Sequence, residues 1–325
     1  MFAFPDEEEN GMSSYVVTVT LNPALDKTVT IGKFNLGGLN RVTDLRIDAG
    51  GKGINVAKVL NRFETGVVAT GLIAGAQGEI LLSLLEKEKI EAQFLKISGD
   101  TRTNLKIVEE ATNVTTEVNE AGFYVSSEEL NRFKEKLSSL LENASFFVLS
   151  GSLPGGVEED IYSHLIQLAR SKGVKTILDA DGSALEAGVK AAPYAVKPNL
   201  HELEKLSGRK MSDTRDIVQA AKTLQEQGVE IVAVSMGAEG ALIMDRKEVL
   251  RVKTFPITPM STVAAGDSMV AALVFSFLNG YPLKKTAKLI TAAGTITASK
   301  PGTQVCSLEE VLQSIEDVQI EEHPF

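Results

Sequence analysis

The sequence predicts an α/β fold in which a mostly parallel central sheet is flanked by helices and carries a small inserted β-sheet. Three observations support this prediction. Short runs rich in β-branched residues alternate with helical patterns, and such alternation is typical of parallel sheets covered by helices. Residues 28–48 and 103–118 instead indicate consecutive strands without helices between them. The last third of the chain has a mainly helical pattern.

The central strands are expected where short apolar runs end in turns. These runs are residues 16–21, 67–73, 146–150, 175–179 and 231–235. Apolar residues at helical spacing occupy residues 80–89, 128–141, 161–172, 217–227, 268–278, 283–299 and 308–318. Ser307 and Glu310 are spaced as a capping box, which predicts the start of the last helix.

No internal repeat and no long low-complexity linker divides the 325 residues. We therefore expect one domain over residues 15–325 rather than two independent ones. Residues 28–48 and 103–118 are expected to form a lid over a site or an edge for dimerisation. Residues 1–14 contain a run of acidic residues and no apolar stretch, so we expect a flexible acidic tail rather than a signal peptide.

The charge balance restricts the partners. Lys and Arg total 33 against 43 Asp and Glu, a formal net charge of -10, which repels nucleic acid and anionic membrane surfaces. An anionic substrate therefore requires a local cluster of cations or backbone amides. The single cysteine, Cys306, cannot form an internal disulfide, and no apolar run approaches the ~20 residues of a membrane span. We expect a cytoplasmic protein.

Glycine-rich turns after strands are the candidate ligand sites, since open α/β sheets bind ligands there. The turn at residues 50–55, GGKGIN, leads into a helical pattern at residues 56–62. Its glycines allow close approach of a ligand, and Lys52 with a helix N-terminus favours an anion. A flexible hairpin or a glycine-rich helix start explains this motif alone equally well.

Two further turns also have two interpretations. Residues 264–267, AAGD, precede an apolar helix, so that consecutive N–H groups could form an anion hole beside a proton-accepting carboxylate. The alternative is that Asp267 is only a helix cap. Asn199 and Glu202 either form a capping box or organise Mg²⁺ through water molecules near nucleotide phosphates.

Eight segments, taken in order, resemble one family, the ribokinase-like carbohydrate kinases of the PfkB group. The resemblance covers nearly the whole chain from Tyr15 onward. The segments are TLNPALDK (20–27), GGKGIN (50–55), TRTN (101–104), SGSLP (150–154), KPNLHE (197–202), SMGAEG (235–240), STVAAGDSMVA (261–271) and PGT (301–303).

The resemblance implies a role for particular residues. Asp267 is implied as the catalytic base, and the amides of Ala265, Gly266 and Asp267 as the anion hole. Lys52 and Arg102 are implied to hold the phosphate that the substrate already carries. The implied substrate-binding residues are Asp26, Gly50, Gly51, Lys52, Asn55, Arg102, Asn104 and Ser150. The implied ATP-binding residues are Lys197, Asn199, Glu202, Ser235, Met236, Gly237, Ala238, Glu239, Gly240 and Gly266.

The implied reaction is phosphoryl transfer from ATP, with Mg²⁺, to the free hydroxyl of a ketohexose monophosphate. The sequence is most similar to the 1-phosphofructokinase subgroup, which implies D-fructose 1-phosphate as the substrate. Tagatose-6-phosphate kinases and minor 6-phosphofructokinases are the alternatives. Leu39 stands where the 6-phosphofructokinases have a phosphate-binding lysine, with Arg41 kept two residues on, and this disfavours that subgroup.

Two positions depart from the family pattern. Ala264 and Ala272 stand where the family usually has glycine. A methyl group at a residue with positive φ costs roughly 1 kcal/mol, so a catalytically silent sugar-phosphate sensor is the alternative from a different class. The resemblance also implies a homodimer formed through the lid strands.

Overall fold

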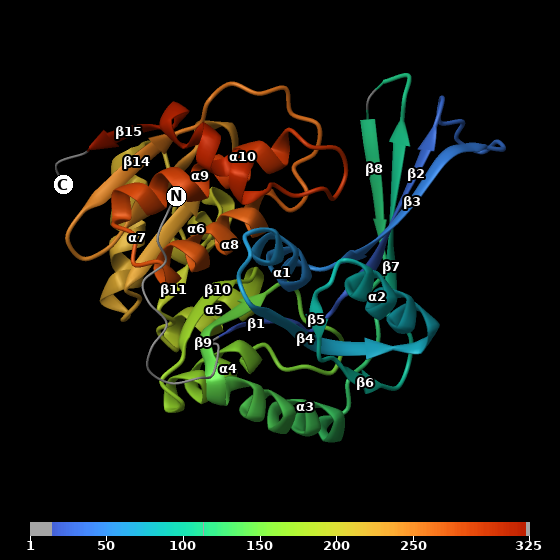
Figure 1. Ribbon diagram of the computed structural model, residues 1–325, viewed down its shortest axis with the longest axis horizontal. Coiled ribbons are helices and arrows are strands. Elements are labelled where there is room, and N and C mark those ends of the chain that lie inside the picture. The colour runs from blue at the N-terminus through green and yellow to red at the C-terminus, as the bar shows by residue number, and fades with distance from the viewer. Residues whose placement is uncertain (1–14, 113, 323–325) are drawn as a thin grey trace.

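The computed structural model describes residues 15–112 and 114–322, and over these residues it contains two separate sheets (Figure 1). The eleven-stranded large sheet has the order β15-β14-β13-β12-β11-β10-β9-β1-β4-β5, and β6 also pairs with β4. Its pairs from β5 to β12 are parallel, and β13, β14 and β15 are added antiparallel at one edge. The predicted mostly parallel sheet is confirmed. The tail expected at residues 1–14 lies outside the described residues.

The elements alternate along the chain much as the sequence predicts. The strands of the large sheet are β1 (Tyr15–Thr20), β4 (Val67–Ala74), β5 (Glu91–Ala92), β6 (Leu95–Ile97), β9 (Ala144–Ser150), β10 (Lys175–Asp179), β11 (Ala195–Val196), β12 (Ile231–Ser235), β13 (Ala241–Met244), β14 (Val249–Lys253) and β15 (Gln319–Glu322). The helices are α1 (Lys52–Arg62), α2 (Gly75–Lys87), α3 (Ser127–Leu140), α4 (Ile161–Ser171), α5 (Gly182–Lys190), α6 (Leu200–Ser207), α7 (Thr214–Glu226), α8 (Ala265–Leu278), α9 (Leu283–Ala298) and α10 (Leu308–Ser314). None of these described helices is both long enough and apolar enough to cross a membrane.

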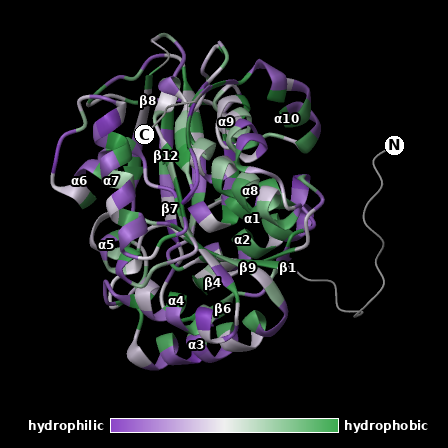
Figure 2. Ribbon diagram, turned by 90° about the vertical axis from the view of Figure 1, so that its left-hand side faces the viewer, coloured by the Kyte–Doolittle hydropathy of each residue, from purple (hydrophilic) through white to green (hydrophobic). Residues whose placement is uncertain are grey.

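Successive residues of a central strand enter different cores, because side chains of a strand alternate between the two faces of its sheet. In β9, Phe146 and Val148 belong to the core that also contains residues of α1, α2, α8 and α9. Phe147 and Leu149 belong to the other core, with residues of α3, α4, α5 and α7. Helices α1 and α8, which contribute to the first core, lie next to each other and are largely coloured as hydrophobic in Figure 2. Burial of both faces explains why these strands are continuous apolar runs.

Helix α5 was not predicted, and several helix starts differ from the prediction, including that of α2, which begins at Gly75 rather than at residue 80. Helix α1 begins at Lys52 rather than at residue 56, and α8 begins at Ala265 rather than at residue 268. Glycine in both first turns weakens the helical signal of the sequence. The capping box of Ser307 and Glu310 is present at the start of α10, but the α-helix ends at Ser314 rather than at residue 318.

The second sheet is formed by the two segments that were expected to lack helices. Its strands are, in order, β3 (Val42–Gly50), β2 (Ala24–Ile31), β7 (Arg102–Glu109) and β8 (Val114–Asn119). These four strands extend away from the helix-covered body (Figure 1). The predicted small sheet is confirmed, and its function as a lid remains a prediction.

Strand register gives the small sheet two chemically different faces. Asp26 pairs with Asn104 and, two residues along the strand, Lys106 pairs with Glu117, so these polar side chains share one face. The other face is apolar and largely uncovered within this chain. Its 40–54% exposed side chains include Val42, Leu45, Ile47, Val114 and Val118.

Candidate active site

A cavity of about 1170 Å³ lies where the large sheet meets the small sheet. Thr20, Asp179 and Ser235, the last residues of β1, β10 and β12, line its floor. The polar face of the small sheet lines a second wall, and the start of α8 lines a third. The carboxyl ends of parallel strands are where open α/β sheets bind ligands, so the fold itself places a site here.

Asp267 lies in the first turn of α8 at the wall of this cavity. The residue is 6% exposed, and its Oδ2 accepts a hydrogen bond of 2.8 Å from Asn55 Nδ2 on α1. Asp267 does not cap its helix, because the N-cap residue is Ala264 and no side chain caps the helix there. The interpretation of this aspartate as a simple cap is therefore wrong, and its carboxylate is available to the cavity.

The start of α8 is built to receive an anion. Ala264 has a left-handed backbone with φ 61° and ψ 0°, which turns the chain into the helix. The N–H groups of Gly266 and Asp267 are in the first turn, where no helix carbonyl can accept them. The N–H of Ala265 makes only a long contact of 3.4 Å to the carbonyl of Thr262. Such an end attracts negative charge.

Gly266 leaves room for a lysine. A Cβ atom at this position would lie 3.3 Å from Lys197 Nζ, so a side chain would crowd the ammonium group. Lys197 follows β11, and its Nζ lies 3.5 Å from Asp179 Oδ1. Lys52 approaches the same oxygen from α1 at 3.4 Å. Two ammonium groups therefore flank one buried carboxylate beside the α8 N-terminus.

The neighbouring charges set the protonation states of this cluster. Burial by itself raises the pKa of Asp179, but the ammonium groups of Lys197 and Lys52 outweigh burial, and the pKa of this carboxyl is lowered. Asp179 in turn raises the pKa of Lys52. Asp179 and Lys52 are therefore charged at neutral pH.

Asp267 behaves in the opposite way. Burial, together with the negative charge of Asp179, raises the pKa of Asp267 to about 6. The hydrogen bond from Asn55 and the charges of Lys52 and Lys197 act against this rise without cancelling it. A carboxylate with a pKa near the working pH is suited to accept a proton during a reaction.

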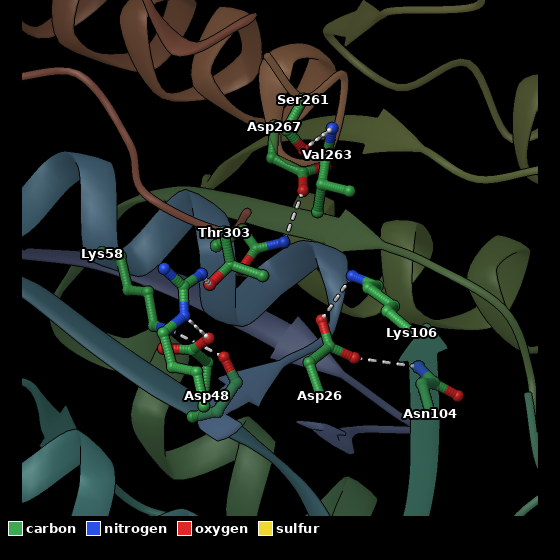
Figure 3. A network of polar contacts seen from close by, with 12 residues as sticks. Asp26, Asp48, Lys58, Asn104, Lys106, Ser261, Val263, Asp267 and Thr303 are labelled. Atoms are coloured by element: carbon green, nitrogen blue, oxygen red, sulfur yellow. Dashed lines mark hydrogen bonds and ion pairs between the residues drawn. The ribbon is translucent and has the colours of Figure 1, made fainter. Parts of the chain in front are cut away.

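The small sheet supplies a second polar cluster, drawn in Figure 3. Asp26 is 5% exposed, and its Oδ1 accepts a hydrogen bond of 3.1 Å from Asn104 Nδ2. Its Oδ2 lies 3.2 Å from Lys106 Nζ. Arg102 completes the cluster and donates through Nη1 and Nη2 to the carbonyls of Glu120 and Asn22, each at 3.1 Å.

Several buried polar atoms on this side of the cavity have no hydrogen-bond partner among the described residues. They are Asn22 Oδ1, Asn55 Oδ1, Arg102 Nε and Asn104 Oδ1. Buried polar atoms in proteins are normally hydrogen-bonded. Their convergence on one cavity indicates a ligand rich in hydroxyl groups or oxyanions.

The opposite end of the cavity is formed by loops suited to a nucleotide. The segments that contain Asn199 and Ser235 lie side by side, and a parallel β-bridge pairs the two residues. Asn199 Oδ1 accepts from the N–H of Glu202 at 2.9 Å, and Glu202 Oε2 accepts from the N–H of Asn199 at 2.8 Å. The predicted capping box is confirmed. Both residues also line the cavity.

Comparison with known proteins identifies the family to which the chain belongs. The family model described as pfkB family carbohydrate kinase matches residues 19–310. The chain belongs to this family. The chain is 39% identical to a 1-phosphofructokinase of Xanthomonas campestris pv. campestris, over 86% of this chain and 90% of that protein.

Solved structures give the same result as the sequences. Phosphofructokinase-2 from Escherichia coli, in complex with potassium, is 31% identical with a TM-score of 0.88, covering 94% of this chain and 99% of that one. A tetrameric inhibited form of that enzyme is 29% identical with a TM-score of 0.86, over the same shares of the two chains. The fold expected from the resemblance is confirmed.

Most of the predicted residues of this kinase line the cavity, and four do not. Among the residues that line it are Asp26, Gly51, Lys52, Asn55, Arg102, Asn104, Lys197, Asn199, Glu202, Ser235, Gly237, Ala238, Gly240, Ala265, Gly266 and Asp267. Gly50 lies behind Asp26, and a Cβ atom there would lie 2.6 Å from the Asp26 carboxyl carbon. Ser150 is fully buried at the end of β9, and its neighbours Gly151 and Ser152 line the cavity instead.

Met236 and Glu239 also do not line the cavity. Met236 packs against the hydrophobic core, and Glu239 forms an ion pair of 3.5 Å with Arg251. Ser235, Gly237, Ala238 and Gly240 of the same turn line the cavity instead. Direct nucleotide contacts are therefore not expected from Met236 or Glu239.

Sequence reasoning missed several residues that line the site of this kinase. Asp179 was visible only as the end of a strand, and Lys106 only as a residue of the small sheet. The segment at residues 254–259 and the small side chains of Thr291, Gly294 and Ala298 also line the cavity. The polar end of an otherwise apolar strand was the available signal for Asp179.

The backbone of Ala264 gives a first prediction. Changing Ala264→Gly removes an αL penalty of about 1–2 kcal/mol, but it adds about 0.4–1 kcal/mol of unfolded-state entropy and loses about 0.8 kcal/mol of methyl burial. These effects nearly cancel, so the free energy of unfolding measured by urea denaturation should change by less than about 1 kcal/mol.

Ala272→Gly is the matched control for this prediction, because Ala272 is buried in the regular part of α8. There the helix propensity of glycine and the lost methyl burial add together to about 2 kcal/mol of destabilisation. Equal losses of stability in the two variants would contradict a conformational role for position 264.

The raised pKa of Asp267 gives a second prediction. Because Asp267 is protonated below its pKa of about 6, kcat/KM should fall about tenfold for each pH unit below that value. The phosphate of a substrate also titrates near pH 6, so the pH profile of the unchanged protein is not sufficient by itself.

Asp179→Asn separates the two titrations. It removes a negative charge that raises the pKa of Asp267, so the acid limb of kcat/KM should move to lower pH, whereas the pKa of the substrate's phosphate does not change. A limb at the same pH in both proteins would assign it to the substrate and not to Asp267.

Proposed function

We propose that this kinase transfers the terminal phosphoryl group of ATP to the free primary hydroxyl of D-fructose 1-phosphate, forming D-fructose 1,6-bisphosphate. One observation carries the proposal: a buried carboxylate with a raised pKa lies at an anion-attracting helix start, in one cavity with a lysine cluster and the polar residues of the small sheet. The 1-phosphofructokinase relatives, of which five are 33–39% identical over 86–95% of this chain, support the choice of sugar.

Asp267 acts as the base in this reaction. The acceptor hydroxyl lies against the Asp267 carboxylate, which Asn55 holds in place through the 2.8 Å hydrogen bond. The hydroxyl oxygen attacks the terminal phosphorus in line, a new P–O bond forms, and the bond to the ADP oxygen breaks. The hydroxyl proton passes to Asp267, so charge and atoms balance.

The N-terminus of α8 and the two lysines stabilise the negative charge of the transferring group. The N–H groups of Gly266 and Asp267 face the cavity end where Lys197 and Lys52 meet Asp179. Fixed donors of this kind act on charge that develops in the transition state. We place Lys52 with the transferring phosphoryl group rather than with the sugar's own phosphate, since its nearest charges are Asp179 and Asp267.

ATP and Mg²⁺ are the proposed co-substrate and metal. Asn199 and Glu202 use one oxygen each in their capping box, which leaves Glu202 Oε1 as an acceptor for a water of hydrated Mg²⁺. No cluster of three or more His, Cys, Asp or Glu able to hold a metal directly occurs in residues 15–112 and 114–322. Mg²⁺ usually keeps several waters, so this sparse set is compatible with it. When bound, Mg²⁺ supplies charge neutralisation at the ATP phosphates.

We also propose that two copies of the chain join through the small sheet. Its outer face exposes five aliphatic side chains, Val42, Leu45, Ile47, Val114 and Val118, at 40–54% each. A four-stranded sheet with an uncovered apolar face tends to find a partner surface. The tetrameric form of the Escherichia coli enzyme supports association between chains of this family, although it does not specify a dimer.

A substrate panel tests the proposed reaction. ADP release is measured with fructose 1-phosphate, fructose 6-phosphate and tagatose 6-phosphate at equal concentrations. We expect the highest kcat/KM for fructose 1-phosphate, because the resemblance and the relatives agree on this sugar. A higher kcat/KM for either of the other sugars would reject the substrate assignment, and binding without turnover of any of them would favour a sensor.

Light scattering tests the proposed dimer. The unchanged protein should have a mass of twice 34.8 kDa, and Leu45→Glu should reduce it to that of one chain, because it places a charge in the apolar face. Leu312→Glu on α10 is the control, since Leu312 is similarly exposed at 44% but lies on the body. A monomeric unchanged protein with full activity would contradict the shared lid.

A further inference from the structure

Lys106 is a buried lysine in the wall of the active-site cavity, and the reaction described above does not use it. It lies on β7, and the residue is 7% exposed. Its Nζ lies 3.2 Å from Asp26 Oδ2. An ammonium group has three donors, and Asp26 accounts for one of them, so the others are available to the cavity that Lys106 lines.

The cationic side chains that line the cavity fall into two separate groups. Among the described lining residues there are four Lys or Arg side chains. Lys52 and Lys197 share Asp179 at the end where the phosphoryl group is transferred. Arg102 and Lys106 lie on the small sheet, and the carboxylate nearest to both is Asp26.

Arg102 alone cannot balance the charge at the small sheet. Asp26 is one acidic residue of this sheet. Glu117, which lies opposite Lys106 on β8 and also lines the cavity, is another. A sugar phosphate adds about two more negative charges at neutral pH. Two of the Arg102 nitrogens already donate to the carbonyls of Glu120 and Asn22. Without Lys106, a phosphate would therefore lie next to the buried Asp26 carboxylate and near Glu117, with only Arg102 to offset their charge.

The positions of the two ends of the substrate determine which of its charged groups lies next to Lys106. The acceptor hydroxyl must lie at Asp267, next to Lys52 and Lys197. The phosphate that a ketohexose monophosphate already carries is at the other end of the sugar, and it therefore faces the small sheet. Lys106 is on the polar face of that sheet, between Asp26 and Glu117.

We propose that Lys106 is a specificity-determining residue that binds the substrate's existing phosphate and neutralises Asp26, so that this kinase accepts phosphorylated rather than free ketohexoses. This inference rests on the proposed function. Asp26 remains available to sugar hydroxyls while its charge is cancelled. The Asp26–Lys106 pair can therefore bind sugar hydroxyls and also accept a phosphate group next to it.

Lys106→Met tests the proposal, because methionine has a similar length without the charge. KM for fructose 1-phosphate should rise about 10- to 100-fold, the range expected when a hydrogen bond to a charged group is lost. KM for ATP should change less than twofold. With unphosphorylated fructose as acceptor, kcat/KM should fall clearly less than with fructose 1-phosphate, because only the pairing of Asp26 is lost and no phosphate contact.

Two matched variants accompany it. Lys106→Arg keeps the charge and should retain most of the affinity for fructose 1-phosphate. Lys96→Met is the control, since the Lys96 side chain is 64% exposed and pairs with Glu79 on the surface. An increase of less than threefold in KM for fructose 1-phosphate, or an equal loss with fructose and fructose 1-phosphate, would overturn the proposal.

The failure of this inference can be told apart from failure of the proposed function. If the unchanged protein prefers another ketohexose phosphate, the substrate assignment fails, and Lys106→Met is then judged with the preferred sugar. If Lys106→Met does not fold, a crystal structure of the unchanged protein with its sugar phosphate decides. Lys106 Nζ within 4 Å of a phosphate oxygen supports the proposal, and a longer distance overturns it.

Discussion

The active site depends on one buried electrostatic arrangement, the sharing of Asp179 by Lys52 and Lys197. Removing an isolated carboxylate from water costs several kcal/mol, so Asp179, whose side chain is 2% exposed, stays charged here because the two lysines lie beside it. With Asp267 included, two lysines and two aspartates balance one another in the wall of the cavity. The same balance leaves Asp267 with a raised pKa and keeps the Lys52 ammonium group positive. A carboxylate suited to accept a proton and a cationic cluster suited to bind an anion therefore lie within one small volume.

The parallel sheet explains why these groups meet. Strands β10 and β11 are neighbours and end at the same edge, so Asp179 and Lys197 leave the sheet side by side. Helix α1 begins at that edge with Lys52, and α8 begins there with the N–H groups that face the cavity. Gly266 and the left-handed Ala264 allow the helix to start close to the lysine. An acidic protein can thus bind two anionic substrates through local charge alone.

The small sheet uses the alternation of side chains in a strand for two purposes. One face of the sheet places Asp26 of β2 and Asn104 and Lys106 of β7 in the cavity, and the other face presents aliphatic side chains of β3 and β8 to the outside. Because β2 and β7 are hydrogen-bonded to β3 and β8, a partner on the apolar face would also restrain the strands that carry the residues of the cavity.

The sequence by itself determined the alternation of strands and helices, the separate small sheet and the glycine turns, because apolar periodicity and glycine act over a few residues. Its resemblance to a family also singled out Asp267, which lines the cavity. Only the tertiary structure decided which charges meet: Lys52 and Asp179 are 127 residues apart, and Asn55 and Asp267 are 212 apart. It likewise showed that Asn199 and Glu202 form a capping box and also line the cavity, and it placed Lys106 beside Asp26. Contacts across such separations depend on strand order and helix starts, which local patterns do not encode.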